Sequence, residues 1–161
     1  MAFAESVLGS LATRARFPEC ERAVGNMSLD TIANMLSALK NASMASAGSI
    51  ELPYFRQGKE ILEVFKQRGL VNELKVFKPE GKDYKYMHVD LATGADGARR
   101  ILETRRISKP GNRVCRPYAK LAKVKAGLGV VVVSTSRGVM AGEEARKKKL
   151  GGEVLCSCFF K

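Results

Sequence analysis

The chain has 161 residues and a formal net charge of +12, from 28 Lys and Arg against 16 Asp and Glu. This length suits one compact domain or two small ones, and a composition of 45% hydrophobic and 27% charged residues excludes a disordered chain. No apolar run approaches the roughly 18 residues that a membrane-spanning helix needs. We therefore expect a soluble protein with no membrane-spanning segment.

The excess positive charge lies entirely in the last part of the chain. Residues 1–27 carry three basic and three acidic residues, and residues 28–98 carry nine of each. Residues 99–161 carry sixteen basic and four acidic residues, which accounts for the whole net charge. Charge that served solubility alone would be spread along the chain, so this segregation indicates a polyanionic partner. Nucleic acid is the leading candidate, and an anionic membrane surface is a weaker one.

The first half predicts an α-β-α-β-β unit that follows an N-terminal extension. The extension, residues 1–27, combines apolar residues at helical spacing with arginines, which is compatible with an organelle-targeting segment or a retained surface extension. We expect one helix capped by Ser28 and ending near Asn41, and a second helix ending at Gly69. The expected strands are a short one stopped by Pro53 (49–52), then 70–77 and 84–91.

A Gly- and Ala-rich linker, residues 93–98, separates this unit from a second, mainly β unit. Its expected elements are strands at 101–107, 128–133 and 154–160, with short helices at 118–125 and 142–150. The sequence therefore predicts an α+β fold of two small α/β domains in contact. Their predicted bounds are 28–98 and 99–161, and the second domain is basic.

The four cysteines give no metal motif, because Cys20, Cys115, Cys156 and Cys158 contain no C-x-x-C pair. On a strand, Cys156 and Cys158 point to the same face, a geometry too constrained for a routine disulfide. We therefore expect reduced, mostly buried thiols in a reducing compartment, and no metal or other cofactor.

The segment after the apolar strand at 128–133 holds the densest group of polar side chains. Three hydroxyls, a cation and a glycine follow one another there: Ser134, Thr135, Ser136, Arg137 and Gly138. Such a cluster at a strand end can bond phosphates, 2′-hydroxyls and base edges. The alternative is an ordinary Ser-rich turn that caps a helix, because hydroxyls often serve local turns.

Two further segments of the basic half carry candidate RNA contacts. In residues 105–113, Arg106, Lys109 and Arg113 flank a Pro-Gly turn and are expected to project from one edge, although a solvated charged loop is the alternative. In Gly151-Gly152-Glu153, the glycines permit close backbone approach. Glu153 can accept hydrogen bonds from a base or organise neighbouring cations.

Taken together, R-x-S-K-P-G-x-R, S-T-S-R-G-V-M and L-G-G-E-V-L-C, in that order, resemble the bacterial-type small-subunit ribosomal protein eight family. The D-x-I-A-x-M-L motif at residues 30–36 agrees, and the resemblance covers about residues 28–159. It implies two α/β domains in tight contact that bind the central domain of small-subunit ribosomal RNA and nucleate its folding. Neighbouring small-subunit ribosomal proteins are implied as further partners, with no enzymatic activity and no small-molecule substrate.

The resemblance also assigns residues. The segment 134–138 matches the family's RNA-contacting loop, and Glu153 matches an acidic residue that contacts RNA from the final strand. Asp30 and Asn34 match a first helix whose start approaches RNA, and Arg56 closes a Tyr-Phe-Arg segment where the family has Ser-Ser-Lys.

Other positions depart from the family. Cys115 replaces a Tyr that stacks on RNA, and Lys149 replaces a helix-ending Gly. With the extension, these departures indicate an organellar member in a mitochondrial ribosome. A plastid or the bacterial cytoplasm is the alternative location.

Rival functions fit the sequence less well. An RNA-processing enzyme needs a general base, and the only histidine, His88, has no carboxylate pair or metal ligand spaced with it. No phosphate-binding glycine loop is present, so we predict that the protein is not an enzyme. A membrane-surface role needs a longer and more apolar helix than residues 141–150 supply. A free-standing RNA-binding regulator or RNA chaperone, which would use the same basic half, remains as the alternative function.

Overall fold

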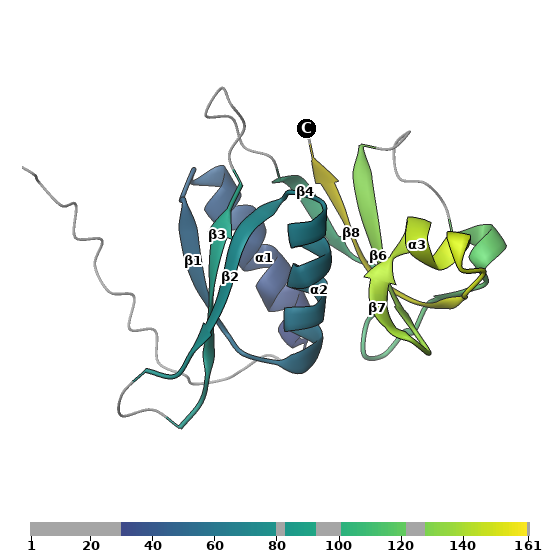
Figure 1. Cartoon of the computed structure of the whole chain (residues 1–161), viewed down its shortest axis with the longest axis horizontal. Helices are drawn as coiled ribbons and strands as arrows, with labels where there is room; N and C mark the ends of the chain where they lie inside the picture. Colours follow the sequence, from purple (N-terminus) through teal and green to yellow (C-terminus); the bar gives the residue numbers. More distant parts are fainter. Residues whose placement is uncertain (1–29, 80–82, 93–100, 122–127, 161) are drawn as a thin grey trace, which may run out of the picture.

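The computed structural model describes residues 30–79, 83–92, 101–121 and 128–160. Two antiparallel sheets enclose a layer of helices, so the predicted α+β class is confirmed (Figure 1). The extension at 1–27 and the linker at 93–98 lie outside the described residues, and the domain bounds drawn there stay predictions.

The N-terminal unit has the predicted α-β-α-β-β order. It comprises α1 (Thr31–Met44), β1 (Ser49–Pro53), α2 (Arg56–Gln67), β2 (Val71–Phe77) and β3 (Tyr86–Leu91). The three strands form an antiparallel sheet in the order β1-β3-β2. Along β3 every second residue is buried, as the two-residue period of a half-buried strand requires.

Two details of this unit differ from the sequence-based expectation. Asp30, and not Ser28, caps α1, because its Oδ1 accepts a hydrogen bond from the Ala33 amide at 3.1 Å. β1 ends at Pro53, which is its last residue, whereas the strand was expected to end at residue 52. Among the described strands β1 pairs with β3 alone, so it is an edge strand, where a proline without an amide hydrogen is tolerated. The expected stop at Gly69 is confirmed by its positive φ of 69°.

The C-terminal unit is mainly β, as predicted. It comprises β4 (Ile101–Arg106), β5 (Cys115–Arg116), the 3-10 turn η1 (Tyr118–Lys120), β6 (Gly129–Thr135), β7 (Gly138–Ala141), α3 (Gly142–Lys147) and β8 (Gly152–Phe160). The sheet order is β4-β8-β6-β7, and β5 pairs with β8 beyond the end of β4. The long strand β8 therefore has β6 along one edge and β4 and β5 along the other.

Four elements of this unit differ from the prediction. Strands β5 and β7 were not expected, because two and four residues are too short to show a periodic pattern. The helix expected at 118–125 begins as a 3-10 turn of three residues, and residues 122–127 lie outside the described part. α3 ends at Lys147, earlier than the expected 150.

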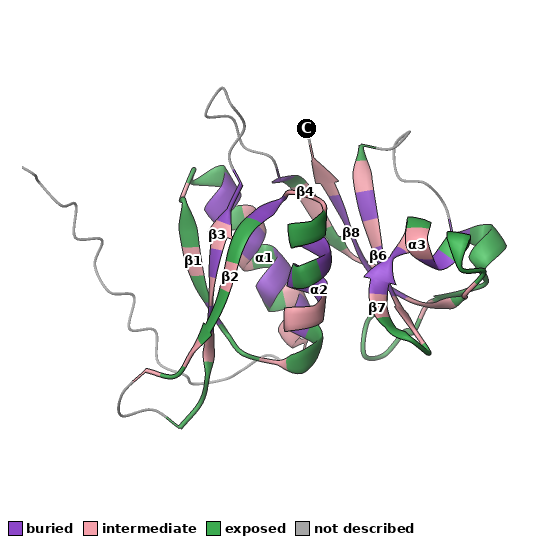
Figure 2. Ribbon diagram, viewed as in Figure 1, coloured by how far each residue is buried: buried purple, intermediate pink, exposed green. Residues whose placement is uncertain are grey.

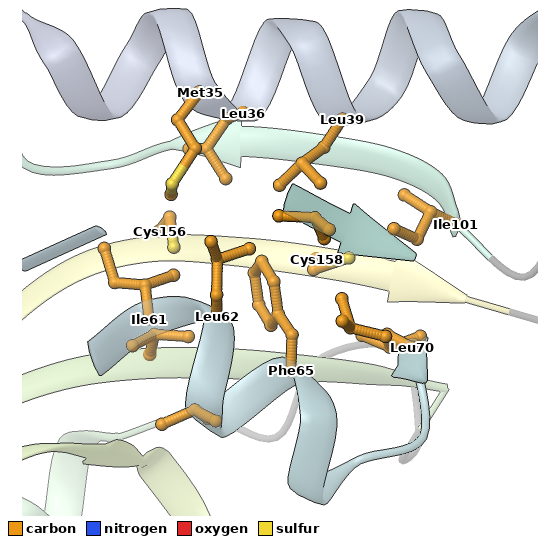
Figure 3. Close-up of a cluster of buried hydrophobic side chains, with 14 of the residues drawn as sticks. Met35, Leu36, Leu39, Ile61, Leu62, Phe65, Leu70, Ile101, Cys156 and Cys158 are labelled. Carbon is orange, nitrogen blue, oxygen red and sulfur yellow. The ribbon is translucent and has the colours of Figure 1, made fainter. Parts of the chain in front are cut away.

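The two units share one hydrophobic core. α1 packs against β1 and β4, and α2 packs against β2 and β7, so each helix contacts both sheets (Figure 1). In Figure 2 the buried surface faces this helix layer, whereas β1 and β2 are largely exposed on their outer side. Figure 3 shows side chains of α1, α2 and β8 meeting in a single cluster, with Phe65 at its centre. Full burial of a side chain such as Phe65 or Leu39 contributes about 1.5–3 kcal/mol.

The thiols in this core are reduced, as predicted. Cys156 and Cys158 are buried and unpaired, and burial raises the pKa of each to about 12. Cys115 is also unpaired but exposed. Neutral thiols at two of the three described positions thus act as small apolar side chains.

Polar contacts fix the C-terminal unit against the helices. The Ser43 hydroxyl donates to the Ile101 carbonyl at 2.7 Å, and the Thr104 hydroxyl donates to the Leu36 carbonyl at 3.1 Å. The Arg68 guanidinium donates to the Glu143 carboxylate at 2.8 Å and so joins α2 to α3. These contacts, added to the common core, set how the segments of both units are presented together.

Candidate nucleic-acid interface

The segment 134–138 forms the turn of the β6–β7 hairpin. Thr135 pairs with Gly138 across the two strands, which leaves Ser136 and Arg137 as the turn itself. The Thr135 hydroxyl accepts a hydrogen bond from the Arg137 amide at 3.2 Å and donates to the Gly138 carbonyl at 2.9 Å. Gly138 has a φ of 107°, a conformation that favours glycine. Thr135 therefore shapes the turn, and the exposed Ser136 and Arg137 are available to a partner.

Strand pairing places three candidate side chains in one row. Glu153 of β8 lies opposite Ser134 of β6 on one side and opposite Cys115 of β5 on the other. Directly opposed residues on antiparallel strands point to the same face, with Cβ atoms about 4.5–5.5 Å apart. A Cβ at Gly152 would collide with the Ser134 carbonyl oxygen, so only glycine permits this approach. The Gly-Gly-Glu segment thus brings Glu153 beside the hairpin, through the close backbone approach that the two glycines were expected to permit.

The Glu153 carboxylate is the centre of a hydrogen-bonded cluster, which we call the Glu153 cluster. Its Oε1 accepts hydrogen bonds from the buried Ser108 hydroxyl and, at 2.8 Å, from Arg113 Nη1. Partial burial acts to raise the pKa of Glu153, but these two hydrogen bonds and the positive charges of Arg113 and Arg106 outweigh it and lower that pKa. The hydrogen bond to Glu153 and the negative charge of Glu153 raise the pKa of Arg113. Glu153 is therefore ionised and organises neighbouring cations, one of the two roles expected from the sequence.

Arg106 and Asp30 are engaged with each other inside the molecule. Arg106 Nε donates to Asp30 Oδ2 at 3.2 Å, and Arg106 Nη1 donates to the Leu155 carbonyl at 2.8 Å. The Arg106 side chain is only 10% exposed, and that of Asp30 is 20% exposed. Asp30 also caps α1, so this pair ties the start of α1 to β4 and β8. Its geometry indicates positioning of the surrounding surface more than direct contact with RNA.

The remaining candidates are exposed and spread over both units. Lys109 closes a small turn, with reciprocal backbone hydrogen bonds of 3.0 Å to Asn112, and its side chain is exposed. Asn34 is exposed one turn into α1, and Arg56 is the first residue of α2, where it pairs with Glu60 at 3.3 Å. In Figure 1 the β6–β7 turn, the loop between β4 and β5, and the starts of α1 and α2 all reach the lower edge of the molecule.

One member of the cluster was not assigned from the sequence. Ser108 lies in the R-x-S-K-P-G-x-R segment, yet its hydroxyl had no expected role. Ser108 is fully buried, and its amide donates to the Val154 carbonyl at 3.1 Å. This hydrogen bond holds the Ser108 hydroxyl beside Glu153. The available signal was a hydroxyl directly at the end of a predicted strand, among basic residues.

The surroundings of His88 also differ from the expectation. Its Nε2 lies 3.1 Å from Asp90 Oδ1, and its Nδ1 lies 4.0 Å from Glu51 Oε1. Strand pairing places Glu51 opposite His88, a neighbour that sequence spacing does not reveal. These groups lie on the outer side of the three-stranded sheet, in a different unit from the Glu153 cluster.

The described residues were also expected to hold no metal and no membrane span. Within the described residues, no three His, Cys, Asp or Glu side chains are grouped so as to hold a metal ion. None of the helices in that part of the chain is both long and apolar enough to span a membrane.

Comparison with known proteins gives a consistent family. The model of the family described as Ribosomal protein S8 matches residues 30–159. Small ribosomal subunit protein uS8 of Helicobacter pylori strain Shi470 is 43% identical over 128 residues, which cover 80% of this chain and 96% of the relative. The protein of the same name from Rubrobacter xylanophilus is 40% identical over 127 residues, or 79% of this chain and 95% of the relative. The chain therefore belongs to the ribosomal protein S8 family.

Proposed function

We propose that this chain is a structural protein of the small ribosomal subunit that binds the central domain of small-subunit ribosomal RNA and nucleates its folding. It acts by binding and not by catalysis, and neighbouring small-subunit ribosomal proteins are its further partners. The observation that carries this proposal is the row of Ser134, Glu153 and Cys115 beside the exposed β6–β7 turn, in a basic unit of a ribosomal protein family.

The two units take different parts in this binding. Residues 99–161 form the RNA-binding domain, and residues 28–98 form a charge-balanced scaffold that adds the start of α1 and Arg56. The contacts are drawn from Ser134–Gly138, Glu153, Lys109 and Arg113. Arg106 and Asp30 support this surface and do not contact RNA themselves, because they are hydrogen-bonded to each other.

The exposed turn supplies both a charge and a hydroxyl. Arg137 forms no salt bridge with another described residue, so its full charge is available to a phosphate. The Ser136 hydroxyl is exposed beside it and is not used within the hairpin, unlike that of Thr135. We therefore assign phosphate neutralisation to Arg137 and local RNA recognition to Ser136.

Binding to a small-subunit RNA fragment that spans the central domain tests these roles. Arg137→Ala should weaken binding to all RNAs and reduce the slope of log affinity against log salt by about 0.7–0.9. Ser136→Ala should keep the slope and reduce discrimination between the fragment and a random hairpin of equal length. Unchanged RNA affinity in both variants would show that the turn is only structural.

Sedimentation separates the ribosomal function from the alternative of a free-standing regulator or RNA chaperone. The full chain, tagged at its C-terminus in its own cells, should travel with small-subunit particles in a sucrose gradient at moderate salt. A stable pool confined to the top of the gradient, with none in the particles, would contradict the ribosomal assignment.

The proposal also includes a cellular location for the protein. We place the chain in a mitochondrial ribosome on account of residues 1–27, which precede the matched region and combine spaced apolar residues with arginines. A fusion of residues 1–27 to a fluorescent protein should enter mitochondria. Plastid import would move the assignment to that organelle, and a cytosolic signal would overturn organellar targeting. The relatives named above are bacterial.

A further inference from the structure

The end of α3 carries a group of cations that the site above does not use. They lie on three neighbouring segments: the end of α3 and the residues after it, strand β5, and the turn η1. We call this group the α3-end surface, and its members are Arg116, Lys120, Arg146, Lys147, Lys148 and Lys149. All six residues are exposed, and none forms a salt bridge with another described residue.

Packing holds these segments together. A Cβ at Gly151 would lie 3.0 Å from the Arg116 carbonyl oxygen and 3.1 Å from Pro117 Cα, so the chain after Lys149 runs directly along residues 116–117. Leu121, which follows η1, belongs to the same buried cluster as Ala145 of α3, and Leu150 packs against that cluster. α3 and η1 therefore form one surface, at the right-hand end of the molecule in Figure 1.

The acidic residues of α3 do not neutralise this charge. Glu143 is directed to Arg68 of α2, at 2.8 Å, and not to Lys147 one turn further along α3. Glu144 forms no salt bridge with another described residue. Charges at i and i+4 commonly pair on a helix surface, so their separation here leaves the lysines open to an external anion.

Lys149 adds an independent observation. Its φ is 54°, in the left-handed region that favours glycine. The Leu150 amide donates to the Ala145 carbonyl at 2.8 Å, and the Lys149 amide donates to the Arg146 carbonyl at 3.1 Å, the hydrogen bonds of a glycine-type helix end. A lysine at this position costs backbone strain and adds like-charge repulsion. Strain of this kind is found where a side chain serves function.

An exposed aromatic ring lies within the group. Tyr118, between Arg116 and Lys120, is 43% exposed. Basic residues interleaved with an exposed aromatic side chain suit RNA, because cations follow the phosphates while a ring stacks on an unpaired base. An acidic protein segment would use the charges but has no base to stack on the ring.

We propose that the α3-end surface is a second RNA contact, which extends from the Glu153 cluster across β5 and η1 to the end of α3. The two surfaces adjoin where Cys115 pairs with Glu153 and Arg116 pairs with Gly152. The new surface binds phosphates of an adjoining RNA segment without reading sequence, and Tyr118 stacks on a base there. This inference rests on the proposed RNA-binding function and adds a contact to it.

Two variants of equal charge test the surface. One replaces Lys147, Lys148 and Lys149 by Gln, and its matched control replaces Lys59, Lys66 and Lys75 by Gln in the N-terminal unit. Affinity is measured from 50 to 500 mM KCl with the central-domain RNA fragment and with a random hairpin. We expect the α3 variant to lower the salt slope by about 2.1–2.7 on both RNAs, which is three contacts at 0.7–0.9 each. The control should change it by less than about 0.5.

A third variant keeps the test valid if the substitutions at α3 unfold that short helix. Arg116→Gln with Lys120→Gln lies outside α3 and should lower the slope by about 1.4–1.8. An unchanged slope in the α3 variant and in this one, or equal effects in the α3 variant and its control, would overturn the second contact. If the unaltered protein failed to distinguish the fragment from the hairpin, the proposed function would fail separately. The salt slopes measured on the hairpin would still show whether the α3-end surface contacts RNA.

Discussion

The two units treat their basic residues differently. Of the eight described Lys and Arg in the N-terminal unit, four form salt bridges with described carboxylates, at Arg56, Lys59, Arg68 and Lys75. Of the eleven described in the C-terminal unit only three do so, at Arg105, Arg106 and Arg113. In the C-terminal unit, most of the described cations therefore form no salt bridge with another described residue. An external polyanion can pair with these cations, and ribosomal RNA, which the family binds, is such a polyanion.

The paired and unpaired cations of the C-terminal unit lie in different parts of the candidate interface. Arg106 and Arg113 bond to Asp30 and Glu153, at the centre of the candidate interface. Arg137 and the lysines after α3 lie at its periphery and have no such partner among the described residues. The candidate interface thus combines an internally bonded centre that fixes its geometry with peripheral cations, which we propose attract RNA.

The largest effect should come from the core that joins the two units. Phe65→Ala removes a fully buried ring and should cost about 3–5 kcal/mol of unfolding free energy. Because the cluster around Phe65 includes residues of both sheets, chemical denaturation should show one transition for the whole molecule. Loss of structure in the N-terminal unit alone would show that the units are independent. Val76→Ala, at a side chain 42% exposed, is the control and should change stability by less than about 0.5 kcal/mol.

The next effect concerns the link between α1 and the C-terminal sheet. Arg106→Gln removes the donor to Asp30 Oδ2 and one of the two donors to the Leu155 carbonyl, which keeps the Ile107 amide. The change should cost about 1–3 kcal/mol in urea unfolding. Arg105→Gln removes the same charge from a side chain 70% exposed and should cost less than about 0.5 kcal/mol. If Arg106→Gln kept full stability and lost RNA affinity, Arg106 would be a direct RNA contact.

A smaller effect separates stability from binding at the end of α3. Lys149→Gly relieves the left-handed backbone at φ 54° and should raise the free energy of unfolding by about 0.5–1 kcal/mol. The same change should weaken RNA binding at low salt, because one cation of the α3-end surface is lost. A stabilised variant with unchanged affinity at every salt concentration would remove Lys149 from that surface.

The smallest effect is a dependence on pH. The pKa of Glu153 is lowered in the folded protein, so its ionised form stabilises the fold above the ordinary glutamate value of 4.5 and this contribution is lost as pH falls through the lowered value. Glu153→Gln should therefore cost no more than about 1 kcal/mol near pH 7, since solvent screens the pair with Arg113. The difference between the two proteins should shrink below pH 4.5. Thermal unfolding over pH 3–7 measures it, and a difference that grows towards low pH would contradict the assigned hydrogen bonds.

Much of the fold follows from local patterns in the sequence. The apolar stripes of α1 and α2, the stop at Gly69 and the alternating strand β3 are periodic over many residues, so their type was predicted correctly. β5 and β7 were missed because they are held by pairing with β8 and β6 and not by their own sequence. The common core of the two units likewise depends on contacts between distant segments, which no local pattern reports.

The candidate site was predicted in part. The residue types of 134–138 and Glu153 indicated polar chemistry, but the pairing of β6 with β8 that places Glu153 opposite Ser134 is not visible in either segment alone. The internal use of Arg106, Asp30 and Ser108 could not be predicted, because their partners are 45 to 76 residues away in sequence. An arginine in a basic run looks the same in sequence whether it faces RNA or a buried carboxylate.

The reactivity of individual lysines tests the central claim most directly. The full chain, free or bound to the central-domain RNA fragment, is acetylated briefly, and the modified lysines are quantified by mass spectrometry. The account predicts that RNA protects lysines of the C-terminal unit, Lys109 first among them, while Lys59, Lys66 and Lys75 react equally in both states. Protection of those three lysines of the N-terminal unit, with the C-terminal lysines still reactive, would contradict it.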